Sequence, residues 1–164
     1  MDSYEGIEMT NVLKIEFNID EIDLNALQPF RGCALFLMTA IQGSVQISDG
    51  QQLIKMDSCP LLQVSYNLIY NCVMPLLYGT TESTLSESVD IVTVLDKGYL
   101  NVRTTFPQGS GGDANMTFSP LQALAEAGRF HAELLKALFA ADDKFRTDSR
   151  VKACLAFASV QLKP

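Results

Sequence analysis

The groups in this sequence that could do chemistry are one histidine, four cysteines and nineteen carboxylates. The histidine, His131, lies on an apolar segment with helical spacing, and no G-x-S-x-G turn is present that would place a serine beside it. A single histidine also excludes the usual multi-histidine metal sites within one chain. These patterns favour a histidine packed on a helix over a catalytic one.

The four cysteines share no spacing that is typical of a metal finger or a CxxC redox pair. Three of them lie in apolar segments, where cysteine packs as a small hydrophobic residue. We therefore expect reduced, structural thiols, and neither a metal nor another cofactor. The cysteines are Cys33, Cys59, Cys72 and Cys154.

Two polar segments resemble ligand sites in composition alone. The glycine-rich loop 108–113 lacks the Lys-Ser/Thr ending of a phosphate-binding loop, so a flexible connector is the favoured interpretation. The acidic run Asp20, Glu21 and Asp23 lacks the spacing of a calcium loop, which favours a solvated turn. Paired carboxylates could still serve as acid and base, but no motif singles out a pair. We therefore expect a protein that is not an enzyme.

The net charge of −7 is unevenly spread, because residues 1–100 hold thirteen acidic and only four basic side chains. Nucleic-acid binding needs lysine and arginine against phosphate, so this charge argues against it. A basic protein partner is compatible with the charge, because complementary fields steer encounter. Residues 1–11 lack the basic and apolar regions of a secretory signal, which predicts a cytoplasmic protein.

The rest of the chain is expected to pack around a helix over residues 57–77. Asp57 or Ser58 could cap this helix, with Pro60 in its first turn and Pro75 bending or ending its last turn. Its apolar residues cover more than one stripe, which predicts a helix covered by other elements.

One narrow stripe of this helix is polar, formed by Gln63, Asn67 and Asn71 with Tyr70 close by. A face in contact with water is the favoured interpretation, and a face that binds a ligand or partner is the alternative. The segment is long enough to span a bilayer, but its polar residues and prolines argue against a membrane span.

The remaining patterns predict strands and two further helices. Strands are expected over residues 12–19, 33–41, 42–48, 51–56, 88–95, 99–106 and 116–118, with a helix as the alternative for 33–41. Asp49-Gly50 and residues 96–98 predict hairpin turns, and residues 20–30 and 78–88 predict loops. Ser119-Pro120 begins a second long helix that stops or bends near Asp142. Residues 151–160 predict a last helix, with a strand as the alternative.

These elements predict an α+β fold in a single domain over residues 1–164. We expect an antiparallel sheet of about five or six strands, with two long helices packed on one face and a shorter C-terminal helix. The oligomeric state is open, and the partly apolar outer face of the hairpin over residues 88–106 could pair with a second copy.

In size, acidity and mixture of elements the chain resembles the small cytoplasmic immunity proteins of bacterial toxin systems. The resemblance covers the whole chain as a type and involves no motif, so it assigns no functional residue. It implies a stoichiometric binding protein that masks the active site of a cognate toxin, which would be basic if the toxin is a nuclease. Acidic residues in predicted loops or at their edges are then the candidates for mimicking phosphates. They are Asp20, Glu21, Asp23, Asp49, Glu82 and Glu87.

Two other classes of function stay open. One is a small-molecule binding domain, with a pocket between the sheet and the helix over 57–77 that Tyr66, Asn67 and Tyr70 would line. The other is a small enzyme of unrecognised type.

Overall fold

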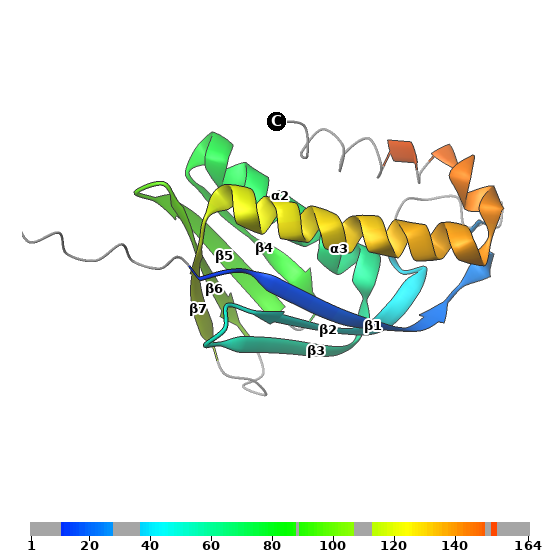
Figure 1. Ribbon diagram of the computed structural model, residues 1–164, viewed down its shortest axis with the longest axis horizontal. Coiled ribbons are helices and arrows are strands. Elements are labelled where there is room, and N and C mark those ends of the chain that lie inside the picture. The colour runs from blue at the N-terminus through cyan, green and yellow to red at the C-terminus, as the bar shows by residue number, and fades with distance from the viewer. Residues whose placement is uncertain (1–10, 28–36, 88, 107–112, 150–151, 154–164) are drawn as a thin grey trace, which may run out of the picture.

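The computed structural model describes residues 11–27, 37–87, 89–106, 113–149 and 152–153. In this part of the chain, strands form two antiparallel sheets, and two long helices lie on the same side of both sheets in Figure 1. The three-stranded sheet has the order β1 (Lys14–Ile22), β2 (Ile41–Ser48), β3 (Leu53–Pro60). The four-stranded sheet has the order β4 (Thr80–Ser86), β5 (Val89–Asp96), β6 (Tyr99–Thr105), β7 (Ala114–Phe118). The helices are α2 (Leu61–Tyr78) and α3 (Pro120–Ala141), and short 3₁₀ turns are η1 (Leu24–Leu27) and η3 (Asp143–Arg146).

The α+β class is confirmed, but the single sheet predicted from the sequence is wrong. The helix α2 separates β3 from β4 along the chain, and it packs against strands of both sheets as well as against α3. Among the described residues, a parallel bridge links Asn11, which precedes β1, to Phe118 of β7. The alternation of apolar and polar residues along a strand predicts which face of its sheet is covered. It does not predict where one sheet ends and another begins.

The central helix begins later than predicted. Residues 57–60 belong to β3, and α2 starts at Leu61. Ser58 has a φ of 53°, at a bulge in the pairing of β2 with β3. Asp57 and Ser58 therefore do not cap the helix. Its end is close to the predicted one, because Gly79 takes a φ of 84° and donates its N–H to Pro75 O at 2.8 Å.

Three further predictions are corrected by the described residues. The polar segment predicted as a loop over 78–88 contains β4, whose Thr81 and Leu85 are buried. Asp20 and Glu21 lie within β1 rather than in a loop. Leu37 and Met38 form a helical turn instead of a strand, whereas residues 33–36 lie outside the described part. The predicted last helix over 151–160 also lies outside it, apart from the helical residues 152 and 153.

The two hairpins and the start of α3 are confirmed. Strands β2 and β3 flank the Asp49-Gly50 turn, and β5 and β6 pair in register around residues 97 and 98. Ser119 is the N-cap residue of α3, with Pro120 at its first position, although the serine side chain makes no capping hydrogen bond. The buried faces of both sheets and both helices share one core, in which Phe17 and Phe130 have ring centroids 4.9 Å apart.

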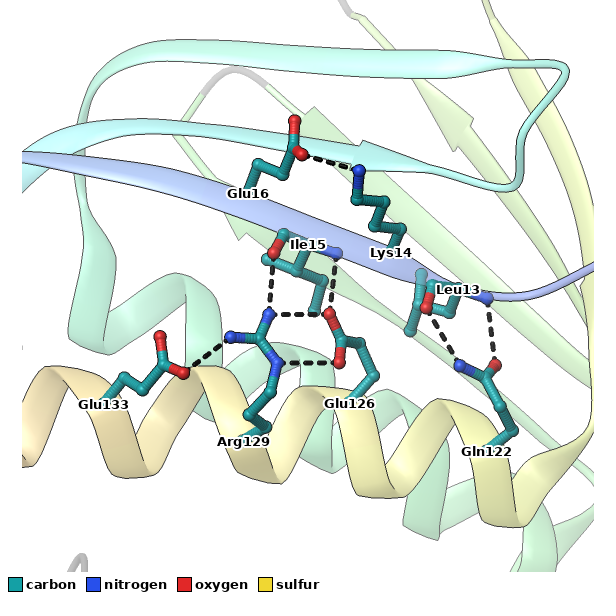
Figure 2. Close-up of polar contacts among 8 residues, drawn as sticks. All are labelled: Leu13, Lys14, Ile15, Glu16, Gln122, Glu126, Arg129 and Glu133. Carbon is teal, nitrogen blue, oxygen red and sulfur yellow. Dashed lines mark hydrogen bonds and ion pairs between the residues drawn. The ribbon is translucent and has the colours of Figure 1, made fainter.

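Side chains complete the hydrogen bonding at several sheet edges. On α3, Glu126 Oε1 accepts from Ile15 N at 2.9 Å, and Arg129 Nη2 donates to Ile15 O at 2.7 Å (Figure 2). Gln52, in the β2–β3 turn, bonds the backbone N–H and C=O of Asn115 on β7 at 2.8 and 2.6 Å. These pairs protect edge groups that would otherwise pair with another strand.

Candidate functional site

The acidic candidates Asp20 and Glu21 are exposed near the end of β1. A bulge lies between Ile19 and Glu21 in the pairing with β2, so Asp20 is the residue that has no partner opposite it. Asp23 follows the strand and is half-buried, and its Oδ1 accepts from Asn25 N at 2.9 Å.

Glu82 and Glu87 are exposed on the other sheet, on β4 and directly after it. Strand β4 runs back along α2, because Asn67 Nδ2 donates to Thr84 O at 2.8 Å. Glu87 therefore lies near the start of α2, which follows directly from the end of β3. The end of β3 is also close to Asp20, whose charge contributes to the raised pKa of the Cys59 thiol after the larger effect of burial.

Asp20, Glu21 and Glu87 thus belong to the end of the molecule where β1 and β3 finish and α2 begins, which we call the acidic end. Among the described residues these three carboxylates make no ion pair with lysine or arginine, and neither does Glu82. Other carboxylates are neutralised locally: Glu16 by Lys14 and Asp57 by Lys55. Unpaired exposed charge leaves a negative field that a basic surface could meet.

Asp49 differs from the other acidic candidates because it is 6% exposed. Its carboxylate accepts from the backbone N–H groups of Gln51 and Gln52 at 2.8 and 2.6 Å, and from Asn11 Nδ2 at 3.1 Å. The side chain therefore holds the β2–β3 turn and the entry to β1 in place. The position of Asp49 in a turn suggested a carboxylate that is exposed to a partner. Because Asp49 is buried, we do not include it in the acidic end.

Two residues of the polar stripe of α2, Asn67 and Asn71, hydrogen-bond to β4. Asn71 is 2% exposed, and its Nδ2 donates to Ser83 Oγ and Asn67 O, both at 2.7 Å. Tyr66 and Tyr70 are half-buried on the same helix. The prediction of a water-facing stripe is therefore wrong for Asn71, because the segment taken as a loop is a strand that covers it.

A cavity of about 30 Å³ lies in the core between α2 and the two sheets. Its wall is mainly aliphatic but includes Asn71, Thr93 and Thr104, and the pocket residues proposed from the sequence do not line it. Asn71 Oδ1 and both threonine hydroxyls are buried without a hydrogen-bond partner among the described protein atoms. The volume accommodates one or two water molecules, so it is too small for an organic ligand in this conformation.

Ser65 and His131 form a buried contact between the two helices, with Oγ and Nδ1 2.8 Å apart. The serine hydroxyl donates to Leu62 O at 2.9 Å, so its single proton is used and Nδ1–H donates to Oγ. Both side chains are 0% exposed. A substrate cannot reach this pair, and it serves to fix the helices against each other.

The ion-pair network on α3 was missed in the sequence. Arg129 contacts Glu126 and Glu133 at 2.7 and 2.8 Å, and its hydrogen bonds lower the pKa of Glu126 (Figure 2). Gln122, Glu126 and Arg129 follow one another at four- and three-residue steps, which places them on one helix face. This helical spacing is visible in the sequence. The sequence does not show that β1 lies opposite that face of the helix.

The described residues contain no group of three or more His, Cys, Asp or Glu side chains that could hold a metal ion. Neither described long helix combines the length and hydropathy needed to cross a membrane. Comparison of the chain with protein-family models, with curated proteins and with solved structures found no significant match in any of the three.

Proposed function

We propose that this chain is a stoichiometric binding protein that neutralises a cognate protein toxin by covering its active site with the acidic end. The observation behind the proposal is the group of exposed carboxylates without ion pairs: Asp20, Glu21 and Glu87. Carboxylates that form no ion pair in the unbound protein can replace substrate phosphates in a basic site. A nuclease is the toxin class whose active site fits this chemistry best.

The strands and helix that carry these groups support a preorganised surface. Glu21 pairs with Gln42 of β2, Asp20 Oδ1 accepts from Asn18 Nδ2 at 2.8 Å, and Glu87 follows a strand that Asn67 ties to α2. Binding to a rigid surface costs less conformational entropy than binding to a loop that must be ordered. Glu82 lies on β4 at a greater distance from the acidic end, and it would contribute to the rim of the interface.

The test is co-expression with the protein encoded next to this chain, followed by calorimetry of the purified pair at several salt concentrations. We expect a one-to-one complex whose affinity falls as salt rises, because salt screens the attraction between opposite charges. The double variant Asp20→Asn, Glu21→Gln should weaken binding at least about tenfold, which corresponds to about 1.4 kcal/mol.

A matched control is the double variant Asp96→Asn, Asp113→Asn, which removes the same charge from exposed positions outside the acidic end. It should reproduce the small change caused by net charge alone. Equal weakening by both double variants would show that the acidic end is not the contact. If the neighbouring protein does not bind at all, the proposal of toxin neutralisation is wrong for that pair.

A further inference from the structure

The outer edge of β3 differs from the other sheet edges because no described element or side chain covers it. The topology places β3 at the end of the three-stranded sheet, and Figure 1 shows no described helix or strand beyond it. In contrast, β1 is bonded by Gln122, Glu126 and Arg129, β7 by Gln52, and β4 by Asn67. An edge of this kind can pair with a further strand.

The pairing pattern identifies which groups of β3 are free. Asp49 N donates to Gln52 O at 3.3 Å, so the next hydrogen-bonded pair is Ile47 with Ile54. Residues 53 and 55 then direct their backbone N–H and C=O groups outward, and Asp57 is the next residue in that alternation. Asp57 and Ser58 together lie opposite Ser44 in a bulge, so the regular free edge is short and ends at Met56.

The side chains beside these free groups are self-complementary. Lys55 and Asp57 are two residues apart on the exposed face of β3, 55% and 70% exposed, with Nζ and Oδ1 3.8 Å apart. If two copies pair antiparallel about a two-fold axis at Met56, each Lys55 lies opposite Asp57 of the other copy. Residues 55 and 57 then supply two hydrogen-bonded backbone pairs, with opposite Cα atoms about 5.5 Å apart.

We infer that this chain forms a homodimer through β3, in which Lys55 pairs with Asp57 across the two-fold axis and the two three-stranded sheets become one. Neighbouring registers are less favourable. Centring the axis on Lys55 opposes two lysines, and centring it on Ile54 opposes Lys55 to Leu53. Charged residues at a sheet edge commonly prevent pairing with another strand. In this register, however, Lys55 and Asp57 of the two copies attract each other.

The test is sedimentation equilibrium of the full chain over a range up to several hundred micromolar. The native chain should dimerise, and Lys55→Asp should raise the dissociation constant at least about tenfold, because it opposes carboxylates at both pairs. The exchange variant Lys55→Asp, Asp57→Lys should restore the native value within about threefold. Circular dichroism of each variant would verify that the fold is retained.

The strand β1 offers a matched control. Lys14 and Glu16 have the same spacing and exposed face in the same sheet, with Nζ and Oε1 2.7 Å apart, but their edge is bonded by α3. Lys14→Asp should leave the dissociation constant unchanged. A strictly monomeric native chain would overturn the inference, and so would equal weakening by Lys55→Asp and Lys14→Asp. Failure of the exchange variant to restore association would reject this register.

Discussion

Gln122 and Leu13 form a closed amide pair between a helix and a strand edge. Gln122 Nε2 donates to Leu13 O and Leu13 N donates to Gln122 Oε1, both at 2.9 Å (Figure 2). The side-chain amide therefore supplies the same donor and acceptor as a neighbouring strand would. One helical turn later, Glu126 and Arg129 do the same for Ile15 with charged groups. Side chains of α3 thus take the place of a fourth strand beside β1 in the three-stranded sheet.

Replacing Gln122 by alanine should lower the free energy of unfolding by about 1 kcal/mol, since two part-buried hydrogen bonds to Leu13 are lost and water replaces them incompletely. Urea titration would measure the change. Gln46→Ala is the control, because that half-buried glutamine lies on the outer face of β2. An equal loss in both variants would show that the amide pair contributes no specific stability.

The pKa of Glu126 is lowered, chiefly by the hydrogen bond from Arg129, with Ile15 N–H and the nearby positive charges adding to the effect. A lowered folded-state pKa stabilises the native protein above the unfolded pKa of about 4.3, and that stability is lost as pH falls through the folded value. Glu126→Gln should therefore reduce stability at pH 7 and flatten its decline between about pH 5 and pH 3.

Urea midpoints at pH 7, 5 and 3 would measure that difference, with Asp96→Asn as a control for loss of one exposed carboxylate. Parallel pH profiles for the native chain and Glu126→Gln would contradict the assignment. If the decline of stability with falling pH were equally reduced in Glu126→Gln and Asp96→Asn, the effect would come from net charge.

The two described cysteines should be unreactive in the native protein. Burial raises the pKa of Cys72 to about 12, and burial with the charges of Asp57 and Asp20 raises that of Cys59 to about 11. At pH 8 the reactive thiolate is therefore scarce, and both side chains are less than a tenth exposed. In a Cys33→Ser, Cys154→Ser background, iodoacetamide should label neither thiol until urea opens the core. Rapid labelling without urea, followed by mass spectrometry, would refute this expectation.

The sequence predicted elements better than it predicted how they assemble. The hairpin turn at Asp49-Gly50 and the start of α3 at Pro120 follow from local chemistry, and both were correctly expected. The strand character of residues 80–86 was missed, because threonine and serine there alternate with few apolar residues. That strand is stabilised by Asn67 and Asn71 on α2, contacts that depend on tertiary structure.

The candidate site was predictable in part for the same reason. Charge identified Asp20, Glu21 and Glu87, which the structure leaves exposed, but it could not distinguish them from Asp49. The difference lies in a turn in which the backbone N–H groups of Gln51 and Gln52 both donate to the Asp49 carboxylate. Side-chain type alone does not reveal how many donors a fold directs at it.

The hydroxyl of Thr104 is the best place to test the core cavity. Its side chain is 1% exposed, lines the cavity and has no hydrogen-bond partner among the described protein atoms. Such a hydroxyl costs about 1–3 kcal/mol, whereas a methyl group of similar size packs against the aliphatic wall. Thr104→Val should therefore raise the free energy of unfolding by about 1 kcal/mol. Thr105→Val, half-buried on the opposite face of β6, should change it little. A loss of stability in Thr104→Val alone would mean that the hydroxyl is hydrogen-bonded to a water molecule in the cavity.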